Sequence, residues 1–212
     1  YDSTVKKAVE SARASVANLI NAEARELYFT SGATESINWA LKGFAEANFD
    51  RGNHIITVCT EHKAVLSTCD YLEKKGFEVT YLPVNSNGVL SLENLISTIR
   101  DTTLLVCVMY VNNEIGVIQN IAQIGAVCRE RDICFFTDAT QAVGKLPINV
   151  VEENIDMLAL SGHKFYGPKG VGALYVRRGV KISPLLHGGG QEAELRGGTY
   201  NSPGIVGLGK AC

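Results

Sequence analysis

The sequence has little of what marks a membrane protein or a nucleic-acid-binding protein. None of its apolar runs reaches the length of a transmembrane helix, and its first residues do not read as a signal peptide. Its 212 residues carry a net charge of −2, with no basic block longer than the pair Arg177-Arg178. Such a balance gives no electrostatic case for nucleic acid. We therefore expect neither a membrane nor a nucleic acid among its partners.

Cysteines spaced as in metal sites are also missing. The six cysteines form no Cys-x-x-Cys pair and fit no zinc template. Cys107 and Cys134 stand inside apolar runs, where a cysteine serves as a small buried side chain in a reducing compartment. Internal repeats and low-complexity linkers are absent too. The 46% apolar share is enough for one domain with a sizeable core.

What the chain does have is a regular alternation of helical and extended patterns. Residues 3–20 carry apolar side chains at helical spacing. Because the later apolar runs are continuous rather than alternating, they predict a mostly parallel sheet of about seven strands with helices on both faces, a three-layer αβα fold. We predict strands at 27–30, 54–58, 77–82, 104–111, 133–137, 157–160 and 171–176, and helices at 31–47, 61–75, 91–99, 121–131 and, as a short one, 140–143.

Chemically versatile side chains follow many of these strands. In a parallel sheet, ligands gather at the carboxyl ends of the strands. We therefore expect one site at that edge. The residues that follow the strands are Thr34, His62, Asn113, Glu114, Asp138, Gln141, Ser161, His163 and Lys164.

The segment Ser161-Gly-His-Lys-Phe-Tyr-Gly-Pro-Lys-Gly170 is the most informative stretch. It puts Lys164 at the mouth of the sheet, where burial can lower the pKa of the amine and favour a Schiff base with an aldehyde. A solvated surface lysine is the alternative, but it leaves the flanking Ser, His and Gly-Pro-Lys-Gly unexplained. A nucleotide P-loop is also a poor match, because Pro168 stands where that motif needs Lys and Gly170 where it needs Ser or Thr.

These ten residues resemble the cofactor-lysine motif of the class V aminotransferase family, whose members use pyridoxal phosphate (PLP). Within that family they are most similar to the cysteine desulfurases that supply sulfur for iron–sulfur clusters. The resemblance extends over nearly the whole chain, including Thr60-Glu-His-Lys-Ala-Val and Val111-Asn-Asn-Glu-Ile-Gly. It implies a homodimer and, over residues 1–212, the large PLP-binding domain of the aspartate-aminotransferase-like fold. The ends of the sequence look cut, so we expect a small C-terminal domain to be missing from it.

The resemblance also implies a role for each residue of the site. Lys164 would hold PLP and take the α-proton of the substrate. Asp138 would keep the pyridine nitrogen protonated, so that the ring can absorb carbanion charge. His62 would stack over the ring and carry protons. The remaining contacts would come from Ala33, Thr34, Ser161 and His163 to the phosphate, Gln141 to the ring hydroxyl, Asn113 to the substrate carboxylate and the cofactor, and Thr199 to the phosphate of the neighbouring subunit.

Taken without the resemblance, two of these positions have simpler explanations. The turn Ser31-Gly-Ala-Thr-Glu35 suits a phosphate, but the same residues are common as a helix cap without a ligand. Asp138, at the end of a strand, is likewise a frequent helix N-cap. The resemblance favours the cofactor role for both.

As a function, the resemblance implies conversion of L-cysteine to L-alanine, with the sulfur leaving as a protein persulfide for iron–sulfur scaffold or acceptor proteins. The compartment would be the bacterial cytoplasm or the mitochondrial matrix. None of the six cysteines matches the family's persulfide loop, and the substrate-binding arginine is expected beyond residue 212, so we expect this piece alone to be inactive. Two alternatives stay open. One is another class V enzyme, an aminotransferase or a lyase; the other is a non-catalytic assembly module, against which the Asp138 and Lys164 pair argues.

Overall fold

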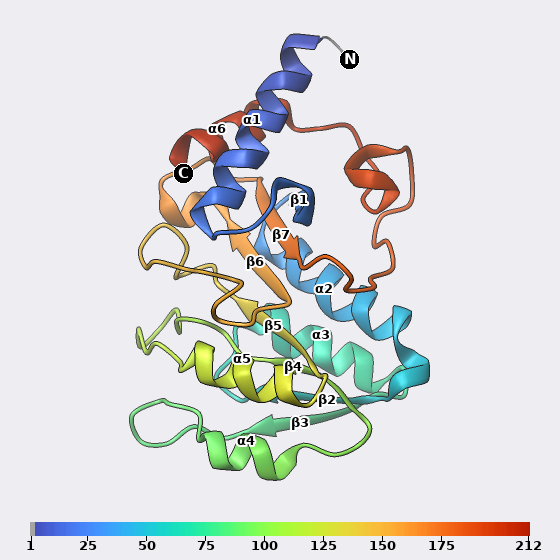
Figure 1. The fold of residues 1–212 in the computed structure, drawn as a ribbon, viewed down its shortest axis with the longest axis vertical. Coiled ribbons are helices and arrows are strands. Elements are labelled where there is room, and N and C mark those ends of the chain that lie inside the picture. The colour runs from blue at the N-terminus through green and yellow to red at the C-terminus, as the bar shows by residue number, and fades with distance from the viewer. Residues whose placement is uncertain (1–2) are drawn as a thin grey trace.

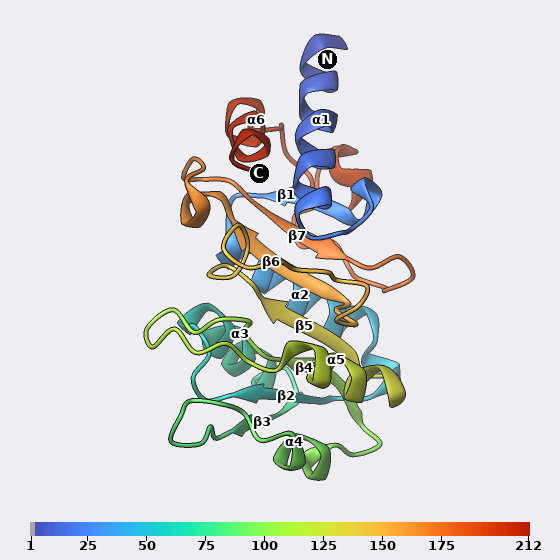
Figure 2. The same cartoon turned by 60° about the vertical axis from the view of Figure 1, so that its left-hand side comes forward.

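A seven-stranded sheet forms the middle layer of the computed structural model, which describes residues 3–212; Tyr1 and Asp2, part of the predicted domain 1–212, lie outside the described residues. The order across the sheet is β1-β7-β6-β5-β4-β2-β3, and Figure 2 shows the strands following one another in this order, away from the chain ends. Their bounds are β1 (Leu27–Thr30), β2 (His54–Val58), β3 (Glu78–Leu82), β4 (Thr103–Cys107), β5 (Cys134–Asp138), β6 (Met157–Ser161) and β7 (Gly172–Val176).

The direction of the strands brings most of their carboxyl ends to one edge. Strands β3, β2, β4, β5 and β6 run parallel, and β7 runs antiparallel to both of its neighbours, β6 and β1. Because two reversals cancel, β1 points the same way as β6. The predicted mostly parallel sheet of about seven strands is confirmed, and its carboxyl edge is where a ligand site belongs.

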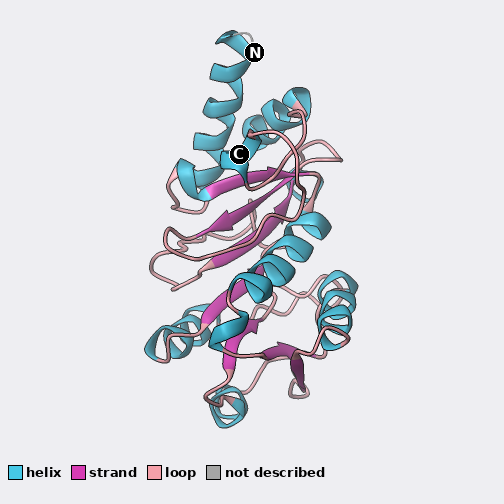
Figure 3. Cartoon of the chain, turned by 90° about the vertical axis from the view of Figure 1, so that its right-hand side faces the viewer, coloured by secondary structure: helices cyan, strands magenta, loops and turns pink. Residues whose placement is uncertain are grey.

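Helices cover both faces of the sheet, as Figure 3 shows. One buried core lies under α1, α4, α5 and α6, and a second core lies under α2 and α3 on the other face. The three-layer αβα arrangement is therefore confirmed. In Figure 1, α1 and α6 lie side by side near the two chain ends. The helix bounds are α1 (Ser3–Leu19), α2 (Ala33–Ala47), α3 (Lys63–Glu73), α4 (Leu92–Thr98), α5 (Ile121–Glu130) and α6 (Ser202–Ala211).

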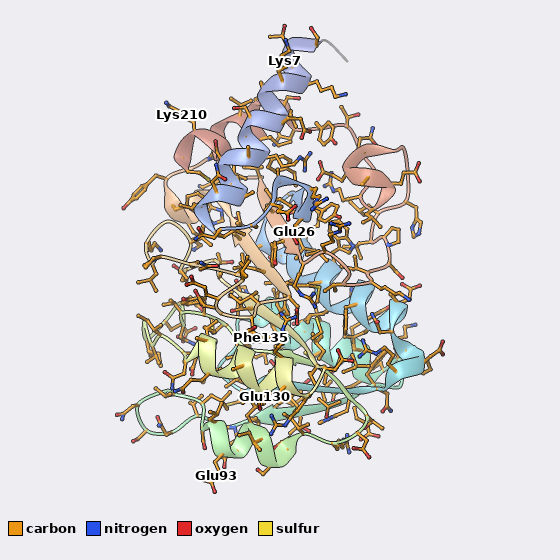
Figure 4. All side chains as sticks on the ribbon, viewed as in Figure 1. Lys7, Glu26, Glu93, Glu130, Phe135 and Lys210 are labelled. Atoms are coloured by element: carbon orange, nitrogen blue, oxygen red, sulfur yellow. The ribbon has the colours of Figure 1, made fainter. Side chains whose placement is uncertain are left out.

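Burial explains why most residues of the inner strands are apolar. Every residue of β2, β4, β5, β6 and β7 is buried, whereas the edge strand β3 exposes two of its five residues. Phe135 is buried and lies near the centre of the view in Figure 4, while Lys7, Glu93 and Lys210 are exposed and lie at its periphery. In the described part of the chain, no helix is both long and apolar enough to cross a membrane.

Two predicted elements differ from the structure by more than two residues at an end. The strand predicted at 104–111 ends at Cys107, because its pairing with β2 stops there, although the amides of Val108 and Tyr110 still donate to Phe136 and Asp138. The short helix predicted at 140–143 is a series of turns. Its first bonds, from Ala142 and Val143 to the carbonyl of Ala139, are not extended into a helix, since Gly144 takes a positive φ of 75°.

Candidate functional site

A cavity of about 490 Å³ opens at the carboxyl edge of the sheet. Its lining comes from the ends of β1, β4, β5 and β6 and from the starts of α2 and α3. These segments are far apart in the sequence and meet only because their strands are neighbours in the sheet. Nine of the ten predicted site residues line the cavity: Ala33, Thr34, His62, Asn113, Asp138, Gln141, Ser161, His163 and Lys164.

The start of α2 forms one wall of this cavity. The residue before the helix is Gly32, which supplies no side-chain cap to the helix N-terminus. The amides of the first turn are therefore left for another acceptor, and they carry the positive end of the helix dipole. Ser161, on the neighbouring strand end, shares a hydrogen bond of 3.0 Å between its Oγ and Nδ1 of His163. Together these groups form a cradle that suits an anion.

The close packing beneath this cradle requires glycine at Gly172. A Cβ on Gly172 would lie 2.4 Å from the carbonyl oxygen of Leu160 and 2.7 Å from Cα of Gly32. The turn before α2 is therefore pressed directly onto the backbone of β7. This contact holds the first turn of α2 beside Ser161 at the end of β6.

A salt bridge anchors the outer side of the cradle. The guanidinium group of Arg196 donates to both carboxylate oxygens of Glu35, at 2.7 and 3.1 Å, and the amide of Ser31 donates to Glu35 at 2.8 Å. Burial by itself raises the pKa of Glu35, but the hydrogen bonds from Arg196 and Ser31 outweigh it and the pKa is lowered. Glu35 is therefore a paired, ionised carboxylate, and its charge is neutralised beside the anion cradle.

Asp138 ends β5 at the floor of the cavity, with 5% of its surface exposed. Its Oδ1 accepts two hydrogen bonds from Thr140, from the amide at 3.0 Å and from the hydroxyl at 2.5 Å. Burial raises the pKa of Asp138, while the Thr140 hydrogen bonds and the charge of His62 lower it in part. Oδ2 accepts no hydrogen bond among those found in residues 3–212, so it can accept one from a ligand in the cavity.

Lys164 lies on the same cavity, on the 3₁₀ turn Gly162–Phe165 that follows β6. The expectation that burial prepares its amine is wrong, because the Lys164 side chain is exposed. The turn carries it out of the buried strand to the open rim of the cavity. The next residue but one, Tyr166, closes this turn in the left-handed region at a φ of 69°.

His62 stands at the start of α3 and serves as its N-cap. Its Nδ1 accepts a hydrogen bond of 3.1 Å from the amide of Ala64. An accepting nitrogen carries no proton, so the neutral ring has its proton on Nε2. The cap thus selects the tautomer that leaves Nε2 as the nitrogen that exchanges protons.

Asn113, Gln141 and Thr199 complete the predicted set. Asn113 is exposed on the loop after β4, and Gln141 is half-buried in the turn after β5, where its Oε1 accepts from Lys145 at 3.1 Å. Thr199 is exposed on the loop that carries Arg196, outside the cavity lining of its own chain. Its predicted contact with a neighbouring subunit stays a prediction.

Sequence reasoning missed three residues that shape this site. Thr140 holds Asp138, and the spacing Asp-x-Thr was a signal for such a turn. Glu35 was seen only as part of a capping pattern, although it binds Arg196. Glu61 was placed inside a helix, whereas it precedes the N-cap of α3 and its side chain is buried. Only the tertiary structure shows the last two contacts.

Comparison with known proteins identifies the family to which this arrangement belongs. A family model described as Aminotransferase class-V matches residues 1–212. The chain belongs to the class V aminotransferase family. The predicted family resemblance is confirmed.

Within the class V family, this chain is similar to cysteine desulfurases. Cysteine desulfurase IscS of Methanosarcina thermophila is 59% identical over 208 residues, which are 98% of this chain and 52% of that protein. Cysteine desulfurase IscS of Clostridium botulinum (strain Hall) is 56% identical over 211 residues, which are 100% of this chain and 53% of that protein. The chain therefore spans about half the length of the curated relatives it matches.

A solved structure agrees with this placement. The structure described as SspA in complex with cysteine superposes with a TM-score of 0.95 at 50% sequence identity. The match covers 98% of this chain and 60% of that one. The three-layer class V fold is thus shared over the described chain.

Proposed function

We propose that this chain is the PLP-binding part of a cysteine desulfurase, which converts L-cysteine to L-alanine and passes the sulfur on as a protein persulfide. The observation that carries the proposal is Asp138, a buried carboxylate with one free oxygen, on the same cavity as Lys164. A carboxylate and an amine in one cavity are what PLP requires at its pyridine nitrogen and its aldehyde. The names of the relatives supply the substrate class.

Three features of the chain fit PLP. The α2 N-terminus has no side-chain cap, which suits a phosphate group together with Ser161 and His163. Asp138 has an oxygen to accept from a pyridinium N–H, and a cation at that position would offset the burial that raises the pKa of this acid. The cavity of about 490 Å³ is within the range of small-cofactor sites. PLP, when bound, supplies an electron sink for charge that develops at the substrate Cα.

The chain's own residues then do three kinds of work. The first turn of α2, with Ser161 and His163, binds and orients the phosphate. Asp138 keeps a proton on the pyridine nitrogen, which strengthens the electron sink. The amine of Lys164 takes the α-proton, and Nε2 of His62 exchanges protons, since its Nδ1 is engaged by Ala64. Asn113 and Gln141 are proposed to bind the substrate carboxylate and the ring hydroxyl.

The sulfur-accepting nucleophile is proposed to be none of the six cysteines. Burial raises the pKa of Cys69 and Cys128 to about 12, that of Cys212 to about 11, and those of Cys107 and Cys134 well above the ordinary value of a thiol. A thiol must ionise to attack sulfur, so these five are poor nucleophiles. Cys59 is exposed but does not line the cavity.

The test uses the full-length protein with added PLP. A visible absorption band should appear in the wild type and be absent in Lys164→Ala. Lys169→Ala is the matched control, because Lys169 lines the same cavity and its variant should keep the band. L-cysteine should then yield alanine and a protein-bound persulfide in equal amounts. A band that persists in Lys164→Ala would contradict the proposed role of this amine.

Product analysis also separates the proposal from its alternatives. Another class V aminotransferase or lyase would bind PLP through Lys164 but form no persulfide from L-cysteine. A non-catalytic assembly module would show neither the band nor the product. The proposed homodimer is tested by mixing Lys164→Ala with Thr199→Ala protein, because a subunit-crossing Thr199 predicts that mixed dimers keep one complete site.

A further inference from the structure

Glu61 has a buried carboxyl group whose place in the site is not explained by the roles above. The residue is 6% exposed and lies between the end of β2 and the N-cap His62. Its Oε1 accepts a hydrogen bond of 2.6 Å from the amide of Met109. Its Oε2 is buried, and no hydrogen-bond partner for it was found among residues 3–212.

The hydrogen bond to Met109 takes over from a strand ladder that stops. β2 pairs with β4 up to Thr57 and Cys107, and the chain after β2 then turns toward β3, where the amide of Cys59 donates to Leu82. The amide of Met109 would have no strand partner beyond that point. A buried amide without an acceptor costs free energy comparable to a lost hydrogen bond. The side chain of Glu61 supplies that acceptor.

Asn112 forms a second link between the same two loops. Its Nδ2 donates to the carbonyl of Thr60 at 2.9 Å, and its Oδ1 accepts from the amides of Glu114 and Ile115. We call the Glu61–Met109 and Asn112–Thr60 contacts the loop brace. The brace joins the loop that presents His62 to the loop that presents Met109 and Asn113, and all three of these residues line the cavity.

Glu61 and the nearby carboxyl group of Asp138 differ in their expected charge. Burial raises the pKa of Glu61 well above its ordinary value, the Met109 amide lowers it, and the charge of Asp138 raises it again. Cys69 on α3 and Cys107 on β4 also interact with the charge of Glu61, and neither is a cation. One negative charge on Asp138, with Glu61 neutral, satisfies these contacts better than two.

We propose that Glu61 is a positioning residue of this site: through its length and its acceptor oxygen, and not through a negative charge, it holds His62 and the Met109–Asn113 loop at the spacing that PLP needs. The inference rests on the proposed function, because it assigns Glu61 a task in the same cavity. It predicts that shortening the side chain of Glu61 weakens PLP binding and that removing its acidity does not.

Two variants of the full-length protein with PLP separate the effect of side-chain length at Glu61 from the effect of its charge. Glu61→Asp keeps an acid but withdraws the carboxyl group by roughly 1.5 Å, one carbon–carbon bond, which breaks the bond to Met109. Glu61→Gln keeps the length and an acceptor oxygen but cannot ionise. The matched controls are Glu114→Asp and Glu114→Gln, at an exposed carboxylate on the neighbouring loop. The readouts are the PLP dissociation constant and the visible circular dichroism of bound PLP, which reports the orientation of the ring.

We expect Glu61→Asp to weaken PLP binding roughly tenfold and to change the visible circular dichroism. Hydrogen exchange of the peptide covering residues 106–113 should also increase in this variant. Glu61→Gln and both Glu114 variants should match the wild type. The inference is overturned if Glu61→Asp matches the wild type, or if Glu61→Gln is impaired as much as Glu61→Asp or more. Wild-type protein that fails to bind PLP would instead overturn the proposed function, and this inference with it.

Discussion

Asp138 and Asp156 are two aspartates with the same burial and opposite surroundings. Each is 5% exposed, and they lie at opposite edges of the sheet, Asp138 at the end of β5 and Asp156 just before β6. Asp156 accepts from Arg177 at 2.6 Å, from Arg129 at 3.2 Å and from the amide of Phe135 at 2.9 Å. Among residues 3–212, Asp138 accepts hydrogen bonds only from Thr140, on one of its two oxygens.

The contrast teaches which buried charge serves the fold and which serves a ligand. A carboxylate surrounded by arginines has its charge compensated within the chain, and it stabilises the amino edge of the sheet. A carboxylate without a cation costs stability in the folded protein, so it is explained by a positively charged ligand. Glu35, which is paired with Arg196, belongs with Asp156. Glu61 differs from both aspartates, because it has no cation beside it among the described residues and burial raises its pKa well above the ordinary value.

The largest expected effect comes from Asp138→Asn. Loss of the charge beside the pyridine nitrogen should reduce turnover of L-cysteine by about 10²–10³-fold, the scale of removing one strong electrostatic contact in an active site. Thermal stability without PLP should be unchanged or higher, because the amide keeps an acceptor for Thr140. Turnover assays and calorimetry test both halves. If Asp138→Asn had normal turnover and lower stability, Asp138 would be a residue that stabilises the fold, like Asp156, and not one that binds a ligand.

The same variant also tests how the stability of the wild-type protein depends on pH. Burial raises the pKa of Asp138, so the folded protein keeps this proton over a range in which the unfolded chain has lost it. The contribution of Asp138 to the free energy of unfolding is therefore fully present below its pKa in the unfolded chain. It is lost as the pH rises through its pKa in the folded protein. Asp138→Asn should lack this loss in urea titrations of the PLP-free protein.

Asp156→Asn should behave in the opposite way. The amide cannot accept from both arginines and the Phe135 amide, so we expect a loss of about 2 kcal/mol in the free energy of unfolding. PLP binding should stay normal. Asp132→Asn is the control, since Asp132 pairs with Arg51 at the surface and should lose less than about 0.5 kcal/mol. Urea unfolding measures the loss in the free energy of unfolding for both variants. Equal losses would show that burial of the aspartate–arginine pair does not change its contribution.

His54 extends the comparison to a buried base at the amino edge. Its ring nitrogens contact the hydroxyls of Thr103 at 2.6 Å and Thr80 at 2.8 Å. Burial and the charge of Arg100 lower the pKa of His54 to about 4. The pKa of His54 in the unfolded chain is about 6.5, so the neutral ring stabilises the fold fully above that pH. This stabilisation is lost as the pH falls toward 4, and the loss is roughly 2 kcal/mol at pH 5.

Urea unfolding at pH 7.5 and pH 5 measures this loss. His54→Asn keeps a polar side chain that can bond to a hydroxyl but does not titrate, so its stability should change less between the two pH values. His187→Asn, at an exposed histidine, is the matched control and should retain the wild-type loss. A variant at position 54 with the full wild-type loss would place the titrating group elsewhere.

The smallest effect is expected for Arg196→Lys. Lysine keeps the charge but cannot donate in parallel to both oxygens of Glu35. We expect PLP binding to weaken by about threefold, because the anion cradle loses part of its outer anchor while the backbone contact under Gly172 remains. Equilibrium dialysis with PLP measures the change. Arg25→Lys, whose arginine pairs with Glu23 at the surface, should bind PLP as the wild type does.

Much of the fold was predictable because its signals are local. The strand predicted at 54–58 is β2 with the same bounds, and the helix predicted at 3–20 is α1 with one residue fewer. Both rest on the spacing of apolar side chains within one segment. The strand predicted to reach Val111 was too long, since β2 stops pairing with it after Thr57, about fifty residues away in the sequence, and the amide of Met109 then donates to Glu61.

The candidate site was predictable in its members but not in its electrostatics. A strand end in a parallel sheet predicts that Asp138, Lys164 and His62 share an edge, and the cavity contains all three. The exposed state of Lys164, the free oxygen of Asp138 and the tautomer of His62 depend on neighbours from other segments. Such contacts leave no pattern within a short stretch of sequence.

Residue identity and spacing were therefore sufficient for the layers and for the edge at which the cavity opens, and the resemblance of one motif was sufficient for the family. They were sufficient because apolar periodicity and a contiguous motif are properties of single segments. Which carboxyl groups have a cation beside them was decided by the tertiary structure alone. The pairs Arg13–Glu192 and Arg196–Glu35 join residues 179 and 161 positions apart. Only folding brings such charges close enough for their attraction to exceed the cost of removing them from water.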